Sequence, residues 1–461
     1  MHFLAIDLGS SYIKSALINL KTKEILEKSK TAVAGKLYNK NELVHEVNMS
    51  LVLSTILTLI NEYRQRCSSL KGIVLSTQMH GFVLSDAAYG EDVYVSWQDA
   101  RCLCPMPGSE KSYLDHLKEM FSPEEMRSTG VYLKPALGMC NLYALLHARN
   151  FQTGKNAEIF TLGSYIISKL TGQNVCHISN AAPLGLVDIE AGAWREDLIE
   201  KAGFSGLRFP RITSGYEACG IYHVDDEDIP VFPDMGDVQC AVLGCGAGDG
   251  DAVINMATAG QVIMVRDTTD IGRADPSYYE VRPYFGRWYC HMVSRMPSGR
   301  NLDVLIDFLR DVGKRIYASS LSREEVWNRF LSDFSIGDAQ GLQVDVSFYE
   351  LPERLSDGAI HHIDRANLTL DNLFNAALND IGSIYQHYIK MLGGESAPAR
   401  NLIFSGGAIR NNPVLQDILS RTTGLPGRLS PMEDEVYAGL MQVSLWCAGL
   451  QETEKSIALE A

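Results

Sequence analysis

Apolar residues at the start of the chain form two short runs that are separated by a turn-forming segment. Residues 3–6 are all apolar, apolar residues return at 13 and 16–18, and Gly9-Ser10-Ser11 lies between the two runs. Short apolar runs on either side of glycine and serine predict a β-hairpin, with strands at 3–8 and 12–20. A third strand is expected at 25–33.

The pattern then changes its period. Between 42 and 66 apolar side chains recur at helical spacing, and 72–76 is a short apolar run typical of a buried strand. Strands that are joined by a crossover helix indicate an α/β fold. From about 115 to 206 the spacing is mostly helical.

The second half of the chain repeats the opening arrangement. Acidic residues and prolines cluster at 222–234, a helix is expected at 238–243, and a second strand–turn–strand is expected at 252–265. We therefore predict two α/β domains, 1–228 and 229–461, that are diverged copies of one unit and flank a central cleft.

Composition narrows the class of protein. The chain has 461 residues, of which 46% are hydrophobic and 21% charged, as in a folded globular protein. No apolar run has the length of a membrane span, and residues 1–7 carry no charged leader, so we expect a cytoplasmic protein without a membrane partner. The ten cysteines are scattered, which indicates buried thiols. A homodimer is one option for the assembly.

Charge argues against one class of partner. The net charge is −15 and no block of Lys and Arg is present, so a nucleic-acid partner is not expected. ATP stays compatible with this charge, because backbone amides, a few cations and Mg²⁺ hold a nucleotide locally.

The first hairpin turn is a candidate phosphate site. Gly9, Ser10 and Ser11 offer unblocked amides and hydroxyls, Lys14 adds a cation, and Asp7 is suited to hold Mg²⁺ through water. An ordinary hairpin turn explains the same residues, and for this motif alone it is the better explanation.

Two turns in the second half offer similar surfaces. Thr258, Ala259 and Gly260 lie between the strands of the second hairpin, where they could cradle a distal phosphate. Ser405, Gly406 and Gly407 follow the short strand expected at 401–404 and present backbone to a flat base or ribose. The alternative for each is a turn that needs glycine for its shape.

Two segments carry polar groups suited to a sugar. Gln78, Met79 and His80 follow the strand expected at 72–76, at the edge where α/β proteins place their sites. Asp99 and Arg101 lie close to Trp97. This combination is suited to hydrogen bonds with hydroxyl groups and to packing against C–H surfaces. The alternatives are a structural histidine and a salt-bridged surface turn.

Asp237 is the candidate catalytic base. It follows Gly236 at the junction of an expected strand and helix, where the helix dipole also favours a capping carboxylate, so a structural cap is equally plausible on local grounds. The sequence lacks Gly-x4-Gly-Lys-Ser/Thr, His-Arg-Asp with Asp-Phe-Gly, and an early Gly-x-Gly-x-x-Gly, which argues against P-loop, protein-kinase and dinucleotide-binding folds.

Taken in order, these segments resemble the FGGY carbohydrate kinases of the actin-like ATPase superfamily over essentially the whole chain. The resemblance implies two ribonuclease H-like domains, with sugar bound by 1–228 and nucleotide by 229–461. The segments 160–165 with 170–172, and 435–439, are also similar to the family. Within the family, 97–102 and 236–239 are most similar to the sedoheptulokinase subgroup, whereas a Gly-Glu-Arg-x-Pro stretch is reduced to 349–354, which leaves the substrate open.

The resemblance assigns roles to the candidate residues. The first phosphate loop would be Gly9, Ser10, Ser11 and Lys14, the second Thr258, Ala259 and Gly260, and the adenosine motif Ser405, Gly406, Gly407 and Asn411. The expected activity is ATP- and Mg²⁺-dependent phosphorylation of a primary hydroxyl of a ketose, sedoheptulose ahead of xylulose, with Asp237 as general base. Alternatives are another sugar or polyol kinase of the family, a non-catalytic sugar-sensing protein that binds nucleotide, and a degenerate kinase that acts as a scaffold.

Overall fold

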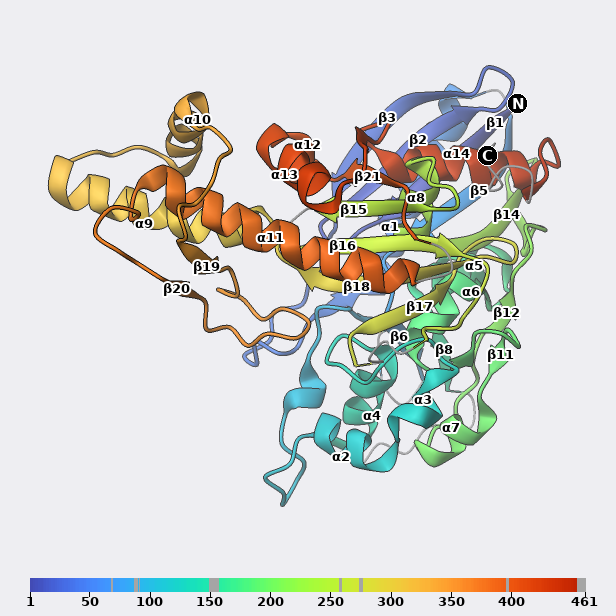
Figure 1. Cartoon of the computed structure of the whole chain (residues 1–461). Helices are drawn as coiled ribbons and strands as arrows, with labels where there is room; N and C mark the ends of the chain where they lie inside the picture. Colours follow the sequence, from blue (N-terminus) through green and yellow to red (C-terminus); the bar gives the residue numbers. More distant parts are fainter. Residues whose placement is uncertain are drawn as a thin grey trace.

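The computed structural model describes residues 1–67, 69–86, 90, 92–148, 157–256, 259–272, 277–394 and 398–453. Two six-stranded sheets dominate the molecule (Figure 1). No helix among these residues is long and apolar enough to cross a membrane.

The first sheet has the strand order β13-β14-β5-β1-β2-β3. Its strands are β1 (His2–Leu8), β2 (Tyr12–Asn19), β3 (Glu24–Ala32), β5 (Leu70–Thr77), β13 (Gly220–Val224) and β14 (Glu227–Gly236). The hairpin predicted near the start is confirmed, because β1 pairs antiparallel with β2, and β1, β5 and β14 are parallel neighbours.

The second sheet has the order β17-β18-β16-β15-β21-β22. Its strands are β15 (Asp251–Met256), β16 (Gly260–Arg266), β17 (Tyr279–Pro283), β18 (Tyr289–Met296), β21 (Asn401–Ser405) and β22 (Gly427–Leu429). As in the first sheet, a strand pairs antiparallel with its successor and parallel with a later strand, β15 with β16 and β21. The predicted internal repeat is therefore visible in the topology.

Two helices lie between the sheets, α8 (Asp237–Gly244) and α14 (Glu435–Cys447). They share one apolar core with side chains of both sheets, such as Phe3 and Val253. The helices approach closely through two glycines: a Cβ on Gly244 would lie 1.8 Å from the Glu435 carbonyl oxygen, and one on Gly439 would lie 2.0 Å from the Cys240 carbonyl oxygen. Glycine is therefore required at both positions.

The outer face of each sheet is covered by further helices. The first sheet packs against α1 (Met49–Arg66) and α5 (Leu162–Thr171), and the second against α11 (Leu370–Gly393) and α13 (Pro413–Thr423). The helix expected from 42 begins only at Met49, because 46–48 form β4 and the Asn48 side chain accepts a hydrogen bond from Ser50 N at 2.9 Å as the helix cap.

A mostly helical lobe is inserted into the first half and has its own core. Its main elements are α2 (Tyr113–Met120), α3 (Pro123–Arg127), α4 (Gly138–Ala148) and α7 (Glu196–Lys201). Nearby lie the short elements β4 (Glu46–Asn48), β6 (Phe82–Ser85), β7 (Val93–Val95), β8 (Glu158–Phe160), β9 (Val175–His177), α6 (Ile178–Ala181), β10 (Val187–Asp188), β11 (Ala193–Trp194) and β12 (Arg211–Thr213).

In the second half, α9 (Gly299–Tyr317) and α10 (Arg323–Asp333) project from the body (Figure 1). The remaining short elements are β19 (Gln343–Asp345), β20 (Ala359–His361) and α12 (Gly407–Arg410).

The expected boundary between 228 and 229 falls inside β14, which pairs with β5 in the first sheet. Pro230 and Pro233, which belong to the expected boundary segment, are accommodated in this strand, and Pro233 lies within a shift of register between Val231 and Asp234. Proline is tolerated at such irregularities, since no ladder hydrogen bond is lost there. The first sheet thus extends to Gly236, and the change of sheet follows at α8.

Candidate active site

Three candidate segments meet at one edge of the first sheet. Thr77 pairs with Leu8 on one side and with Gly236 on the other, so the parallel strands β1, β5 and β14 end side by side. The segments that follow these strands are the Gly9-Ser10-Ser11 turn, Gln78-Met79-His80 and Asp237. The carboxyl edge of parallel strands is where α/β proteins bind their ligands.

The second sheet brings its two candidate turns together in the same way. Asn255 pairs with Ser405, so the ends of the parallel strands β15 and β21 are adjacent. Ala259 and Gly260 return the chain into β16, whereas Thr258 lies outside the described residues. Gly406 has a φ of +88°, and a Cβ there would lie 2.4 Å from the Met256 carbonyl oxygen. The two turns are thus packed backbone to backbone.

Asn411 ends the short helix α12, which follows this turn directly. A Cβ on Gly260 would lie 2.2 Å from the hydroxyl of Tyr385, which donates to the Pro297 carbonyl oxygen at 2.9 Å. Gly260 is therefore also fixed by close packing rather than by turn shape alone.

Asp237 is the first residue of α8, and Gly236 is the N-cap. Its Oδ1 accepts a hydrogen bond from Val238 N at 2.8 Å. Burial, and secondly the negative charge of Asp7, raise the pKa of Asp237 to about 7, while Arg282 acts in the opposite direction. A carboxylate with a pKa near 7 has the proton affinity expected of a general base.

Asp7, on β1, adds a carboxyl group to this edge, and its side chain is buried. It accepts a hydrogen bond from Ser76 Oγ at 3.1 Å. Burial raises the pKa of Asp7 to about 6, although Lys14 and Ser76 lower it. Lys14 also lies 3.7 Å from Asp434 of the second half. The negative charge of Asp7 disfavours the ionised form of Asp237, so a cation bound near both would relieve that repulsion.

The described residues contain no group of three or more His, Cys, Asp or Glu side chains that could hold a metal by themselves. This donor set fits Mg²⁺, which is usually bound by one or two carboxylates together with phosphate oxygens and water. Asp7 is the residue that would hold such an ion.

His80 presents one hydrogen-bond acceptor. Its Nδ1 lies 3.1 Å from the Pro183 carbonyl oxygen, and because a carbonyl only accepts, Nδ1 carries the proton and Nε2 is left as an acceptor. Burial, and then the charges of Arg282 and Lys134, hold the pKa of His80 well below its usual value. The ring is therefore neutral, and its Nε2 can accept a hydrogen bond from a hydroxyl group.

The two neighbours of His80 are more deeply buried. Met79 is only 5% exposed, and its sulfur would lie 2.7 Å from a Cβ on Gly236. Gln78 N donates to the Leu8 carbonyl oxygen at 3.0 Å, which ties this segment to the end of β1.

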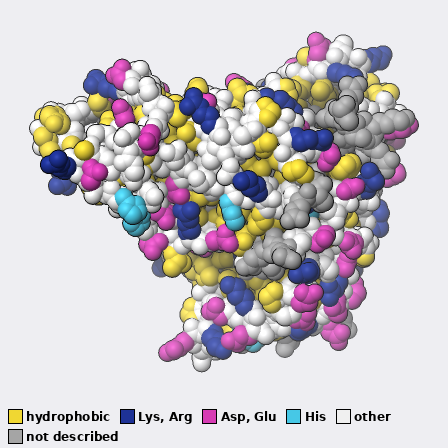
Figure 2. Space-filling model, in the orientation of Figure 1, with side chains coloured by type: hydrophobic (Ala, Val, Ile, Leu, Met, Phe, Trp, Pro, Cys, Tyr) yellow, Lys and Arg dark blue, Asp and Glu magenta, His cyan; other side chains and the backbone are white. Residues whose placement is uncertain are grey.

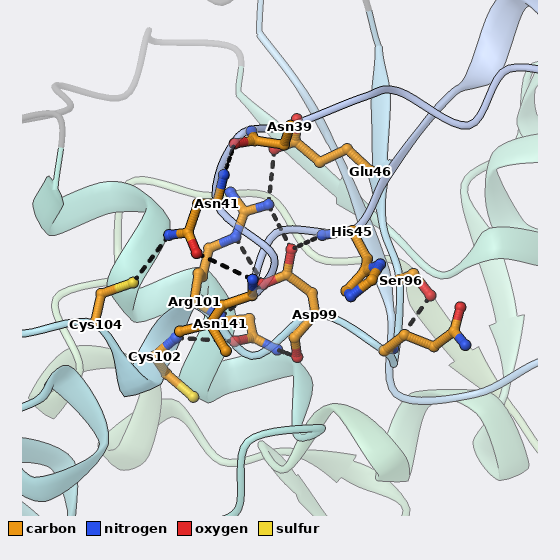
Figure 3. Close-up of polar contacts among 12 residues, drawn as sticks. Asn39, Asn41, His45, Glu46, Ser96, Asp99, Arg101, Cys102, Cys104 and Asn141 are labelled. Atoms are coloured by element: carbon orange, nitrogen blue, oxygen red, sulfur yellow. Dashed lines mark hydrogen bonds and ion pairs between the residues drawn. The ribbon is translucent and has the colours of Figure 1, made fainter.

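Asp99 and Arg101 bind each other (Figure 3). Arg101 donates from Nε to Asp99 Oδ1 at 2.8 Å and from Nη2 to Asp99 Oδ2 at 2.7 Å, and it also reaches Glu46 Oε1 at 2.7 Å. Asp99 Oδ2 also accepts from His45 N at 2.8 Å. Both carboxylate oxygens of Asp99 are thus occupied, and direct contact of Asp99 or Arg101 with a sugar stays a prediction.

A cavity of about 300 Å³ adjoins the Gly9-Ser10-Ser11 turn. Its walls include Gly9, Ser10, Gln78, Tyr94 and Gln98, all of the first half. Sequence reasoning identified three of these residues but not Tyr94 as a site residue. The Gln-Met-His-Gly motif contains an indirect signal, because a Cβ on Gly81 would lie 2.2 Å from the Tyr94 hydroxyl.

A second cavity, of about 970 Å³, separates the inserted lobe from β17 and β18. Apolar side chains gather on the face shown in Figure 2 where the lower lobe meets the upper body. Lys134, Tyr132 and Arg295 are among the polar residues that line this cavity.

Asp234 organises the end of β14 and was not predicted as a site residue. Its buried carboxylate accepts hydrogen bonds from Thr161 Oγ1 and Asn180 Nδ2, both at 2.9 Å, and from His177 N at 3.0 Å. A Cβ on Gly163 would lie 2.2 Å from Asp234 Cβ, so the segment 160–165 packs directly against it. These contacts hold the strand that leads to Asp237.

Three charged residues from both halves lie close to His80. Lys134, between α3 and α4, pairs with Glu280 of β17, and Arg282 of the same strand donates from Nε to Glu280 Oε2 at 2.9 Å. Burial would raise the pKa of Glu280, but Arg282 and Lys134 together hold it below its usual value. No local sequence signal identifies this cluster, because its members are brought together by the tertiary fold.

These observations define the class: two similar α/β domains of the actin-like ATPase fold, with candidate phosphate-binding turns on both and a carboxylate base candidate between them. Residues 2–244 match the FGGY family of carbohydrate kinases, N-terminal domain. The chain belongs to this family of carbohydrate kinases, and is a phosphotransferase that uses an alcohol group as acceptor.

The individual relatives have low sequence identity to this chain, but they align with nearly its full length. Sedoheptulokinase of Mus musculus is 23% identical, with 92% of this chain and 93% of that protein covered. The structure of xylulose kinase from Rhodospirillum rubrum superposes with a TM-score of 0.83 at 17% identity, over 99% of this chain and 92% of the other. Plasmodium falciparum glycerol kinase with ADP gives 0.78 at 16% identity, over 99% and 91%.

Proposed function

We propose that this protein transfers the γ-phosphoryl group of ATP to a primary hydroxyl of a ketose, with Asp237 as the general base. The observation that carries the proposal is the convergence of Asp237, Asp7 and His80 at the ends of three parallel strands. Sedoheptulose is the favoured acceptor, ahead of xylulose, because a sedoheptulokinase is similar over 92% of this chain and because 97–102 is similar to that subgroup.

In the proposed reaction, Asp237 accepts the proton of the acceptor hydroxyl as its oxygen forms a bond to the γ-phosphorus. The bond between that phosphorus and the β–γ bridging oxygen breaks, and ADP leaves with this oxygen. The turns at Gly9-Ser10-Ser11 and at Ala259-Gly260 hold the phosphates through backbone amides and hydroxyls. When bound, Mg²⁺ supplies positive charge to the phosphate oxygens, and Asp7 is the residue that would hold it.

The acceptor is oriented by residues of the first half. His80 Nε2 accepts one hydroxyl hydrogen, and the direction of this bond is fixed because Nδ1–H is committed to Pro183. Ser405, Gly406, Gly407 and Asn411 present backbone and an amide to the adenosine. ATP as donor and the negative charge of the chain fit a cytoplasmic enzyme without a nucleic-acid partner.

The test is the release of ADP from ATP and Mg²⁺ in the presence of sedoheptulose, xylulose, ribulose, glycerol and gluconate. We expect kcat/KM to be highest for sedoheptulose. ADP release without acceptor should be slow, because no acceptor hydroxyl is then held beside Asp237 to be deprotonated. Turnover of glycerol or gluconate far above that of every ketose would overturn the assignment of the acceptor.

A further inference from the structure

The cavity of about 970 Å³ lies between the inserted lobe and the second sheet, where apolar side chains gather in Figure 2. Ligand sites usually enclose about 300–1,000 Å³, so this cavity is large enough for a small organic molecule. None of the candidate residues for the nucleotide, the acceptor or the metal belongs to its described wall. The cavity is therefore separate from those sites.

Apolar side chains from both halves of the chain form much of this wall. The lobe and the second half each contribute to it, with Leu103, Leu114 and Phe121 on one side and Ile271, Tyr279 and Val281 on the other. An apolar body that enters between these side chains is removed from water, which favours binding.

The acidic groups of the wall are all occupied. Each of the four has a partner within the protein: Glu124 pairs with Arg127, Glu350 pairs with Arg295, Glu190 accepts from Thr269 Oγ1, and Asp270 accepts from Gly272 N. The described wall therefore offers no carboxylate that is free to bind a cationic ligand.

One basic group of the wall is not occupied. Four basic residues line the cavity, and Lys118 is the one without an ion pair in the described part of the chain, whereas Lys134 pairs with Glu280. Lys118 is exposed and lies four residues after Leu114 on α2, so the two side chains lie on the same face of the helix. An anionic group at Lys118 would thus lie next to the apolar wall.

Strand β17 separates the cavity from the candidate base. Successive side chains of a strand point to opposite faces, and Tyr279 and Val281 line the cavity, so the side chain of Arg282 lies on the other face. The carbonyl oxygen of Pro283, at the end of β17, accepts a hydrogen bond from Nε2 of Gln239 in α8 at 3.0 Å. A ligand in the cavity would therefore contact a strand that also contacts the helix of Asp237.

The two sides of the cavity are already joined to each other. Val281 N donates to the Gly130 carbonyl oxygen at 2.8 Å, and a Cβ on Gly130 would lie 1.9 Å from the Val281 carbonyl oxygen. Thr269 of the second half donates to Glu190 of the first half. Because the walls are held in place before a ligand arrives, binding requires little further ordering of the chain.

We propose that this cavity binds an organic anion with an apolar body, with the anionic group beside Lys118 and the body between the lobe and β17. A carboxylate, a sulfonate or a phosphate ester supplies the same charge. The site goes beyond the proposed function, since it needs neither the acceptor nor ATP. A molecule bound there contacts both halves of the chain and so stabilises their present arrangement.

Anilinonaphthalene sulfonate, a fluorescent aromatic anion, is a suitable probe, and N-phenylnaphthylamine is its neutral analogue. Calorimetry with the native full-length protein should show saturable binding of the sulfonate and weaker binding of the neutral analogue. The thermal unfolding midpoint should rise with the concentration of the sulfonate, because a ligand of the folded state stabilises it. A fall of the midpoint would show that the probe binds unfolded chains, which would overturn the assignment.

Lys118→Met removes the cation at an exposed position, so the variant should fold normally. Its affinity for the sulfonate should fall by about 2- to 5-fold, the effect of one exposed ion pair, while its affinity for the neutral analogue stays the same. The matched control is Lys314→Met, at an exposed lysine of α9 that also has no ion pair among the described residues but lies outside the cavity wall. This control should bind both probes as the wild type does.

Two variants of Leu103 separate charge from polarity. Leu103 is 43% exposed and lines the cavity, so Leu103→Glu and Leu103→Gln should both fold. Both variants reduce the apolar wall, but only Leu103→Glu adds a negative charge, so it should bind the sulfonate more weakly than Leu103→Gln does. Equal affinities of these two variants for the sulfonate would contradict an anion site.

Competition shows whether the cavity is a second site. Saturating ATP with Mg²⁺, or saturating sedoheptulose, should not displace the sulfonate, because the candidate residues for these ligands lie outside the cavity wall. Displacement by either ligand, or the absence of saturable binding by the wild type, would overturn the proposal. The same affinity in Lys118→Met as in the wild type, or an equal loss in Lys314→Met, would also overturn it.

Discussion

Lys134 and Glu280 form a buried ion pair between the two halves of the chain, since Lys134 precedes α4 and Glu280 lies on β17. The side chain of Lys134 is 16% exposed and that of Glu280 is 1% exposed. The backbone reinforces the contact nearby, where Val281 N donates to the Gly130 carbonyl oxygen at 2.8 Å. Glu280 also pairs with Arg282, so one carboxylate balances the charges of two buried cations.

Glu280→Gln should therefore be strongly destabilising. The change leaves Lys134 and Arg282 buried without their shared anion, which typically lowers the free energy of unfolding by about 3–5 kcal/mol. Chemical denaturation measures the effect. The control is Glu350→Gln, which breaks the exposed pair with Arg295 and should change the free energy of unfolding by about 0–1 kcal/mol. Similar small effects in both variants would contradict a structural role for the buried pair.

Asp237→Asn tests the assignment of the base. A general base typically contributes about 10²–10⁴-fold, so kcat should fall by a factor in that range, while KM for the acceptor changes much less. Steady-state kinetics with saturating ATP measure both constants. Asp228→Asn, at an exposed position on β14, is the control and should leave both constants unchanged. Normal turnover in Asp237→Asn would contradict this assignment and indicate that Asp237 has only a structural role.

The same variant should not lose stability. The pKa of Asp237 is raised in the folded protein, so the ionised side chain opposes folding above pH 7 and the protonated one does not at pH 5. The unfolding midpoint of Asp237→Asn should therefore exceed that of wild type by more at pH 8 than at pH 5. A loss of stability at pH 8 would favour a structural role for the Asp237 carboxylate at the first position of α8.

The pH dependence of kcat/KM should show an acidic limb. Since the base must be ionised and its pKa is raised to about 7, activity should fall as the pH decreases through 7. Arg282 lowers the pKa of Asp237, so Arg282→Met should move the limb to higher pH. Arg295→Met, which removes a more remote cation of the second cavity, should leave the limb in place. An unchanged limb in Arg282→Met would show that another group controls it.

Gly406→Ala should weaken the binding of ATP. The added Cβ would lie 2.4 Å from the Met256 carbonyl oxygen and would strain a residue with a φ of +88°, which displaces the turn expected to hold adenosine. The KM for ATP should rise while the KM for the acceptor stays similar. The control is Gly424→Ala, where φ is +72° but no atom lies within 4 Å of the added Cβ, so stability falls by about 1 kcal/mol without a change in the KM for ATP.

Removal of Mg²⁺ should abolish turnover and weaken the binding of ATP. Asp7 and Asp237 place two carboxyl groups beside the expected phosphates. Without a divalent cation, the negative charges of the carboxylates and of the phosphates repel one another. Calorimetry of ATP binding with Mg²⁺, and with EDTA in its place, measures the difference. Equal affinity under both conditions would contradict the role assigned to Asp7.

The elements that the sequence predicted well are those specified by local patterns. The two hairpins, the strand that ends at Thr77 and the junction at Asp237 each follow from short apolar runs that end in turn or helix signals. Because β1, β5 and β14 are parallel neighbours, their carboxyl ends lie at the same edge of the sheet, and no other signal is needed to predict this. The extent of β14 was missed because prolines usually end strands, whereas here a register shift accommodates Pro233.

The residues that escaped prediction depend on contacts between distant segments. Lys134 and Glu280 are 146 positions apart, and nothing near either residue indicates the other. Asp99 and Arg101 form the salt bridge that was the alternative to sugar binding, but the pair is buried, with Asp99 1% and Arg101 8% exposed, rather than part of a surface turn. Tyr94 was overlooked because a tyrosine within an apolar strand is most often part of the core.

The contact between α8 and α14 has a mechanical consequence. At Gly439 the two backbones touch opposite Cys240, and a helix rises 1.5 Å per residue, so this contact lies about 4.5 Å along the axis from Asp237. In any rotation of one sheet against the other about this crossing, atoms are displaced in proportion to their distance from the pivot. The carboxylate at the start of α8 therefore moves little, whereas the peripheral loops of both domains travel furthest.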